Sequence, residues 1–164
     1  MSAGTDLRPC HDLARLAPKM CAAVEAVLRD CEAAGLDAVV YETYRSQELQ
    51  ALYYARGRSV VPPEHPVTNV RDARSGWHHY GLAVDIISIS RGWDVPESWW
   101  DRLGAIGEAH GLTWGGEWPT LRDYPHVQWG RCRVSPSDRA RELLAEGGVE
   151  AVWREVGAAD PGPG

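Results

Sequence analysis

The run at residues 81–90, GLAVDIISIS, constrains the fold more than any other part of the chain. Its β-branched and apolar residues predict a strand. Side chains alternate along a strand, so Ala83, Asp85 and Ile87 share one face. Both faces are otherwise apolar, and an isolated buried charge is expensive. We therefore expect Asp85 to be buried and either paired or coordinated to a metal; the alternative is a carboxylate turned outward to water.

The other periodic segments predict helices and short strands around this run. Apolar spacing of three and four residues predicts a helix within 12–34, with Pro18 near its start. Capping residues and glycine stops predict further helices at 47–56, 96–109, 137–145 and 149–156. Strands are expected at 37–44, 112–118 and 126–130. This order indicates the α+β class, with a small, mainly antiparallel sheet flanked by helices.

Length and composition predict one domain. The 164 residues fit a single domain, which we place at 1–156, and the Gly- and Pro-rich residues 157–164 are expected to form a flexible tail. The net charge of −6 disfavours nucleic acid as a partner. The sequence has neither a secretory signal nor an apolar run near the ~20 residues of a membrane span. We expect a monomer that is made in the cytoplasm and is not inserted in a membrane.

Four cysteines are present, and none of them is in a CxxC pair. Zinc ribbons and thioredoxin-type redox sites are therefore excluded. We expect the thiols to be reduced and structural, because free buried cysteines behave as small apolar side chains.

Two histidines stand near carboxylates in the sequence. His78 lies just before the strand that carries Asp85, and Asp123 precedes His126 by three residues. A carboxylate at that spacing can place a general base beside a metal ligand. Two His and one Asp with an open position form the ligand set of a catalytic zinc site. The alternative for the second motif is a surface turn at Asp123 followed by a core His126.

Together these motifs resemble the D-alanyl-D-alanine carboxypeptidase and L-alanyl-D-glutamate endopeptidase family of zinc peptidases. The matching segments occur in family order and cover residues 43–129: TYRS at 43–46, Gln50, ALY at 51–53, Gly57-Arg58, VTN at 67–69, His78 with GLAVD at 81–85, LTWGG at 112–116, Trp118 and DYPH at 123–126. The resemblance implies the hedgehog/D-Ala-D-Ala-peptidase-like fold of that family.

The resemblance also implies a metal site. His78, Asp85 and His126 match the family's ligands to one catalytic Zn²⁺ ion. Asp123 matches the general base, and Glu117, which follows the double glycine, is the alternative base.

Four residues match positions that contact substrate. Arg45 resembles the arginine that holds a substrate carbonyl or carboxylate and steadies the developing oxyanion, a role suited to a guanidinium. Gln50 and Trp114 are the next substrate-binding candidates, although Trp114 and Trp118 could equally belong to the core or to the cleft wall. Ser75 resembles the serine before the first ligand, although two residues separate it from His78 where the family usually has one.

The function that the resemblance implies is hydrolysis of peptide bonds in peptidoglycan stem peptides, as an L-alanyl-D-glutamate-type endopeptidase. A phage- or prophage-type endolysin, released to the cell wall by a holin, fits this expectation. The alternatives are a D-alanyl-D-alanine carboxypeptidase or dipeptidase, and an inactive zinc-stabilised binding module. Seven of the eight tryptophans lie at 77–129, which predicts a tryptophan-rich shell around the metal cleft.

Overall fold

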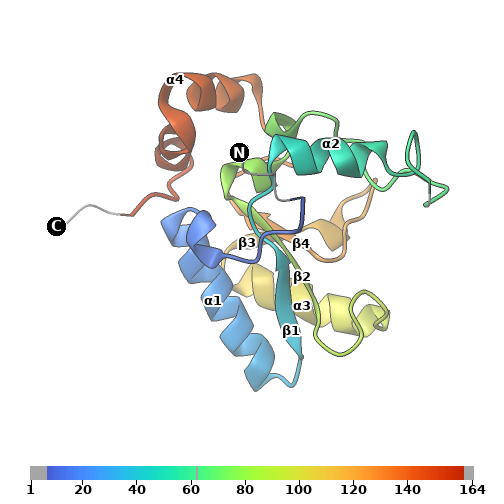
Figure 1. Cartoon of the computed structure of the whole chain (residues 1–164). Coiled ribbons are helices and arrows are strands. Elements are labelled where there is room, and N and C mark those ends of the chain that lie inside the picture. The colour runs from blue at the N-terminus through green and yellow to red at the C-terminus, as the bar shows by residue number, and fades with distance from the viewer. Residues whose placement is uncertain (1–6, 62, 161–164) are drawn as a thin grey trace, which may run out of the picture.

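The computed structural model describes residues 7–61 and 63–160, and a four-stranded antiparallel sheet forms its centre (Figure 1). The strand order is β1-β2-β4-β3. The strands are β1 (Ala38–Glu42), β2 (Ala83–Ser88), β3 (Leu112–Trp114) and β4 (His126–Trp129). The predicted α+β class is confirmed.

Helices surround this sheet near the predicted positions. They are α1 (Pro18–Ala33), α2 (Gln47–Ala55), α3 (Glu97–Ala109) and α4 (Asp138–Glu155). Helix α1 begins at Pro18, because proline has no N–H to donate and is favoured in the first turn. The hydroxyl of Ser46 caps α2 by accepting from the Leu49 amide at 3.1 Å. Gly148, with φ 74°, interrupts α4 at the predicted break.

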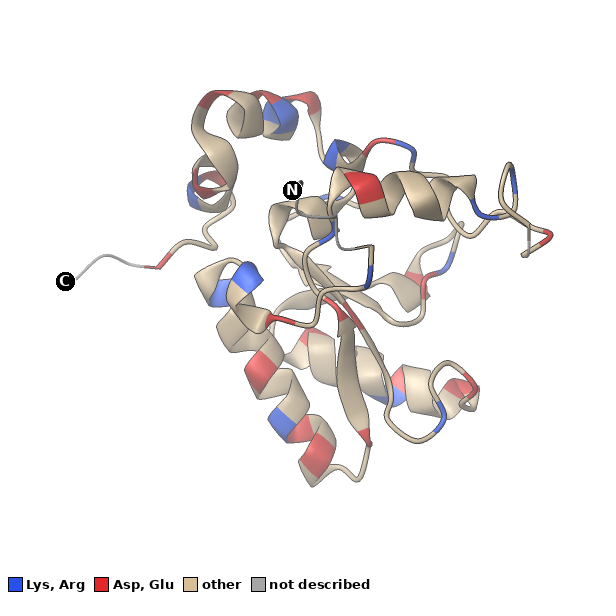
Figure 2. Ribbon diagram, in the orientation of Figure 1, with Lys and Arg blue, Asp and Glu red and all other residues tan. Residues whose placement is uncertain are grey.

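Two of these helices build the core. Helices α1 and α3 pack against each other, α1 against β1 and α3 against β3, whereas α2 lies at the top of the view in Figure 1. Met20 and Val24 of α1, Leu103 of α3 and Val84 and Ile86 of β2 are all 0% exposed. Figure 2 shows acidic and basic residues interspersed along α1, on the surface left outside this core.

An irregularity in β1 changes which residues share a face of the sheet. Val40 pairs with Ile86 and Glu42 with Asp85, so two steps along β1 correspond to one step along β2. Regular alternation would put Glu42 on the core face with Val40, but the extra residue turns it to the face of Asp85. Asp85 also pairs with His126 on β4. Glu42, Asp85 and His126 therefore form a row across three adjacent strands.

The packed structure continues beyond the predicted end of the domain. Ala158 is 0% exposed, its carbonyl accepts from the Lys19 amide at 3.0 Å, and its amide donates to the Trp153 carbonyl at 2.8 Å. The predicted tail from Gly157 therefore starts too early, because these contacts fasten Ala158 to the start of α1. Residues 161–164 lie outside the described part of the chain.

All four cysteines are free. Burial raises the pKa of Cys31 to about 11 and that of Cys132 to about 12, so both thiols stay protonated at neutral pH. Within the described ranges, no helix has the length and apolar character needed to cross a membrane.

Candidate metal centre

Three residues from separate elements meet at one end of the polar face of the sheet. His78 lies on the short 3-10 helix η3 (Trp77–Tyr80), Asp85 on β2 and His126 on β4. Asp85 Oδ1 is 3.4 Å from His78 Nε2 and 3.7 Å from His126 Nδ1. One ligand atom from each of the three residues lies within 4.8 Å of the others.

Local backbone geometry explains why these residues converge. The pairing of Asp85 with His126 places their side chains next to each other on one face. Gly81 follows η3 with φ 68°, which returns the chain directly into β2 and leaves His78 beside that row. A Cβ at Gly81 would lie 2.7 Å from the Arg15 carbonyl oxygen, so this turn requires glycine.

Hydrogen bonds on the far side of each imidazole leave its second ring nitrogen facing Asp85. His78 Nδ1 lies 2.9 Å from the Thr43 carbonyl, which can only accept, so Nδ1 carries the proton. His126 Nε2 lies 2.7 Å from Gln128 Oε1. The Gln128 amide nitrogen donates to the Arg133 carbonyl at 2.7 Å, which turns the amide oxygen toward His126. Outer partners of this kind orient metal-ligating histidines.

The donor set fits a catalytic zinc ion. His78 and His126 are buried, at 6% and 7% exposed, and each directs a free nitrogen toward the Asp85 carboxylate. Burial opposes ionisation of Asp85, but the neighbouring imidazoles, His78 first, hold its pKa well below the usual range. Two imidazoles and one carboxylate beside a cleft match the three protein ligands of catalytic zinc sites.

Asp123 lies at the edge of this triad. Its Oδ2 is 3.7 Å from His126 Nδ1, and its side chain is 45% exposed. Its amide donates to the Gly115 carbonyl at 3.0 Å, which fixes the turn that leads into β4. The part of the carboxylate's surroundings that is closed to water, and then the negative charge of Asp85, raise the pKa of Asp123. A raised carboxylate pKa suits a group that takes up a proton during a reaction.

The alternative base lies elsewhere. Glu117 is beside Glu108 of α3, whose pKa is raised by burial and by a hydrogen bond with Glu117. The cleft that holds the histidines is lined by Asp123 and not by Glu117. The geometry therefore favours Asp123.

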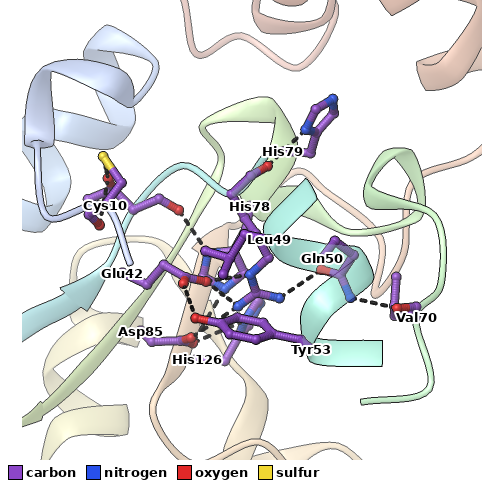
Figure 3. Close-up of polar contacts among 12 residues, drawn as sticks. Cys10, Glu42, Leu49, Gln50, Tyr53, Val70, His78, His79, Asp85 and His126 are labelled. Carbon is purple, nitrogen blue, oxygen red and sulfur yellow. Dashed lines mark hydrogen bonds and ion pairs between the residues drawn. The ribbon is translucent and has the colours of Figure 1, made fainter. Parts of the chain in front are cut away.

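Arg45 Nη2 lies 3.6 Å from Asp85 Oδ2 and belongs to a network of polar side chains. Figure 3 labels its partners Glu42 and Gln50. Its Nε and Nη2 contact Glu42 Oε1, and its Nη1 donates to Gln50 Oε1 at 3.0 Å. The Gln50 amide nitrogen donates to the Val70 carbonyl at 2.5 Å. Gln50 is only 2% exposed, so these two contacts make it a support for Arg45. Its predicted contact with substrate stays a prediction.

A cleft of about 480 Å³ opens beside the triad. Arg45, Ser75, Trp118 and Asp123 contribute to its walls. Exposed apolar side chains also line it: Val67 is 53%, Leu121 73% and Val134 58% exposed. The cleft thus combines polar groups near the triad with apolar groups that a ligand could cover.

The structure corrects the predicted role of the tryptophans. Trp114 is 6% exposed, its indole nitrogen donates to the Tyr124 carbonyl at 2.7 Å, and it does not line the cleft. A Cβ at Gly104 would lie 2.2 Å from its ring, so Trp114 fills the space between α3 and the sheet. Only Trp77 and Trp118 of the described tryptophans line the cleft. The prediction of a tryptophan-rich shell is therefore wrong. The other rings lie elsewhere: Trp100 and Trp114 in the core, Trp99 and Trp129 against it, and Trp93 52% exposed.

Glu42 and Gln128 also belong to the site, although neither was predicted from the sequence. Both are 0% exposed, and each contacts a member of the site. One signal was present for Glu42: like Asp85, it is a carboxylate within a predicted strand. Gln128 stands two residues after His126, on the same face of β4, a position that strand alternation indicates.

Comparison with known proteins finds similar peptidases. Residues 70–129 match the family model described as D-alanyl-D-alanine carboxypeptidase. The peptidoglycan L-alanyl-D-glutamate endopeptidase CwlK of Bacillus subtilis (strain 168) is 32% identical over 105 residues, which are 57% of this chain and 61% of that protein. The L-alanyl-D-glutamate peptidase of Listeria phage A118 is 26% identical over 127 residues, 74% of this chain and 41% of that protein.

A solved structure shows the same fold. The L-Ala D-Glu endopeptidase ChiX of Serratia marcescens superposes with a TM-score of 0.54 at 24% identity, over 71% of this chain and 82% of that one. The chain therefore has the α+β fold of these peptidases. The resemblance indicated by its motifs is confirmed: residues 70–129 match the D-alanyl-D-alanine carboxypeptidase family model, and the chain spans about 61% of the CwlK sequence.

The orientation of His126 by Gln128 leads to a prediction about metal affinity. Replacing Gln128 with leucine removes the acceptor for His126 Nε2–H, and we expect zinc affinity to fall about 10–100-fold, the usual cost of losing an outer partner. Competition titration with a chromophoric chelator measures this change. Thr113→Val, on the neighbouring strand and paired with Gln128, is the matched control. Unchanged affinity in the Gln128 variant would show that the bond does not orient His126.

Proposed function

We propose that this chain is a zinc-dependent peptidase that hydrolyses peptide bonds in peptidoglycan stem peptides. The observation that carries the proposal is that Asp123 and Arg45 both line the cleft beside the triad of His78, Asp85 and His126, Asp123 within 3.7 Å of His126 and Arg45 within 3.6 Å of Asp85. The names of the two curated relatives support the L-alanyl-D-glutamate bond as the one cleaved.

His78, Asp85 and His126 would hold a single zinc ion. When bound, zinc supplies a Lewis acid that polarises a carbonyl and lowers the pKa of water. The chain's own contribution is to keep both imidazoles in the tautomer that presents a lone pair, through the Thr43 carbonyl and Gln128. Rigid outer contacts of this kind preserve the open side of the site for substrate.

Asp123 would transfer the proton of the attacking water, and Arg45 would stabilise the negative charge on the substrate carbonyl oxygen. The Asp123 carboxylate accepts a proton from the attacking water and returns it to the amine that leaves. Its raised pKa brings this transfer closer to neutral pH. Arg45 donates an N–H to the substrate carbonyl oxygen as negative charge develops there. Because a guanidinium does not lose its proton at physiological pH, that donor is always available.

The cleft walls fit a peptide substrate. Ser75 provides a hydroxyl, and the apolar side chains of Val67, Leu121 and Val134 can cover the aliphatic parts of a stem peptide. We propose that the enzyme acts as a monomer on the cell wall after release from the cytoplasm, as an endolysin does. A D-alanyl-D-alanine carboxypeptidase is the second candidate, because the matched family model carries that description.

Digestion of intact sacculi, with free D-Ala-D-Ala as the parallel substrate, tests the proposal. We expect new C-terminal L-alanine and N-terminal glutamate from sacculi, identified by mass spectrometry. Release of D-alanine alone would support the carboxypeptidase instead. A chain that binds zinc but cleaves neither substrate would be a binding module and would overturn the proposed activity.

A further inference from the structure

We propose that Glu42 is a positioning residue that holds Arg45 at the cleft and keeps its guanidinium off the metal ligand Asp85. The inference rests on the proposed function, because Arg45 matters to it as the donor to the substrate. It assigns a role to a buried carboxylate that the proposed chemistry leaves unused.

Both carboxylate oxygens of Glu42 are occupied by contacts with Arg45 and Tyr53. The Glu42 side chain is 0% exposed. Oε1 accepts from Arg45 Nε and contacts Nη2, and Oε2 accepts from the Tyr53 hydroxyl at 2.8 Å. Burial and the Glu42 charge raise the pKa of Tyr53, so that hydroxyl remains a donor. A buried carboxylate with both oxygens occupied is a rigid acceptor, and a guanidinium bound through two nitrogens cannot swing away.

The register shift in β1 creates this arrangement. It places Glu42 directly opposite Asp85, so two carboxylates stand side by side on the polar face of the sheet. Arg45 lies near both, but it contacts Glu42 closely while its Nη2 is 3.6 Å from Asp85 Oδ2. The guanidinium therefore bonds mainly to Glu42, and the Asp85 carboxylate stays available to a metal.

Two uncharged residues also contact the Arg45 guanidinium. Gln50 accepts from Arg45 Nη1 at 3.0 Å, and the Tyr53 ring lies 4.8 Å from the Arg45 guanidinium carbon. Neither partner carries a negative charge. If Glu42 loses its charge, Asp85 is the nearest remaining carboxylate in contact with Arg45. The guanidinium then shifts toward Asp85, where it competes with zinc and leaves its position at the cleft.

A double-mutant cycle on zinc affinity tests this mechanism without relying on activity. Glu42→Gln keeps the shape of the side chain and removes its charge; we expect zinc affinity to fall about 10-fold or more, as for other outer-partner losses. Adding Arg45→Met removes the competing cation, and we expect zinc affinity to return to within about 3-fold of the original, because the two sites are directly coupled. Competition titration gives the affinities, and thermal unfolding confirms that each variant is folded.

Turnover on sacculi provides the second readout. Glu42→Gln should lower kcat about as much as Arg45→Met, and the double variant should be no slower than Arg45→Met alone. Glu48→Gln, an exposed carboxylate on α2, is the matched control and should change neither readout.

The two proposals fail in different ways. A wild-type chain that cleaves nothing, but whose zinc affinity falls in Glu42→Gln and recovers in the double variant, keeps the role of Glu42 and overturns the peptidase. A chain that cleaves sacculi, but whose double variant binds zinc as weakly as Glu42→Gln, keeps the peptidase and overturns the positioning role. Unchanged zinc affinity in Glu42→Gln also overturns it.

Discussion

Replacing Asp123 with alanine should lower peptide hydrolysis about 10²–10⁴-fold, the range of general acid–base catalysis, while zinc remains bound. Asp123 lies beside the ligand set without belonging to it: its carboxylate is 3.7 Å from His126, and 45% of its side chain is exposed. Limited access of water and the charge of Asp85 raise its pKa, so Asp123 can hold the proton between the attack of water and the departure of the amine. Steady-state hydrolysis of a stem-peptide substrate, with zinc content measured on the same sample, checks both halves of the prediction.

Glu117→Ala is the matched control for this experiment. Glu117 lies beside Glu108 and does not line the cleft, so its removal should leave both turnover and zinc content unchanged. Undiminished activity in Asp123→Ala would show that Asp123 is not the general base. Loss of zinc from that variant would instead make Asp123 a fourth ligand.

Replacing His78 with alanine should remove zinc and abolish hydrolysis together. His78 supplies one of the three ligand atoms, and the remaining pair, Asp85 and His126, cannot complete the set that holds a catalytic zinc. We expect zinc affinity to fall by more than about 100-fold, since the loss of an outer partner alone costs 10–100-fold. Competition titration and elemental analysis of the purified variant measure this loss.

His79→Ala is the control for the ligand replacement. The two histidines are adjacent in η3, but His79 Nδ1 bonds to the Arg45 carbonyl at 2.8 Å, and its ring lies away from Asp85 in Figure 3. That variant should therefore keep its zinc. If His79→Ala loses zinc and His78→Ala retains it, the ligand set drawn from the geometry is wrong.

Local patterns predicted much of the fold because they depend on near neighbours in the chain. Apolar alternation placed Asp85 on a face with Ala83 and Ile87, and the structure has that strand at Ala83–Ser88. Gly147 and Gly148, which separate the helices predicted at 137–145 and 149–156, predicted the break in α4, and Gly148 adopts φ 74°. Capping and glycine stops likewise predicted the helices within a few residues of their ends.

Features that depend on pairing between distant strands could not be predicted in this way. The two-for-one register that turns Glu42 toward Asp85 is a property of β1 and β2 together. Trp114 was expected in the cleft, because the sequence does not show that Gly104 and Gly116 leave space for its ring. The bonds from His126 to Gln128 and on to Arg133 also join residues whose proximity is decided by the fold.

The central claim is that His78, Asp85 and His126 form one zinc site. Metal analysis of the purified protein, with a zinc titration after chelation, tests it most directly. We expect one zinc ion per chain, rebound after chelation by the wild type and not by His78→Ala. A chain that binds no zinc, or whose zinc is unaffected by His78→Ala, would contradict it.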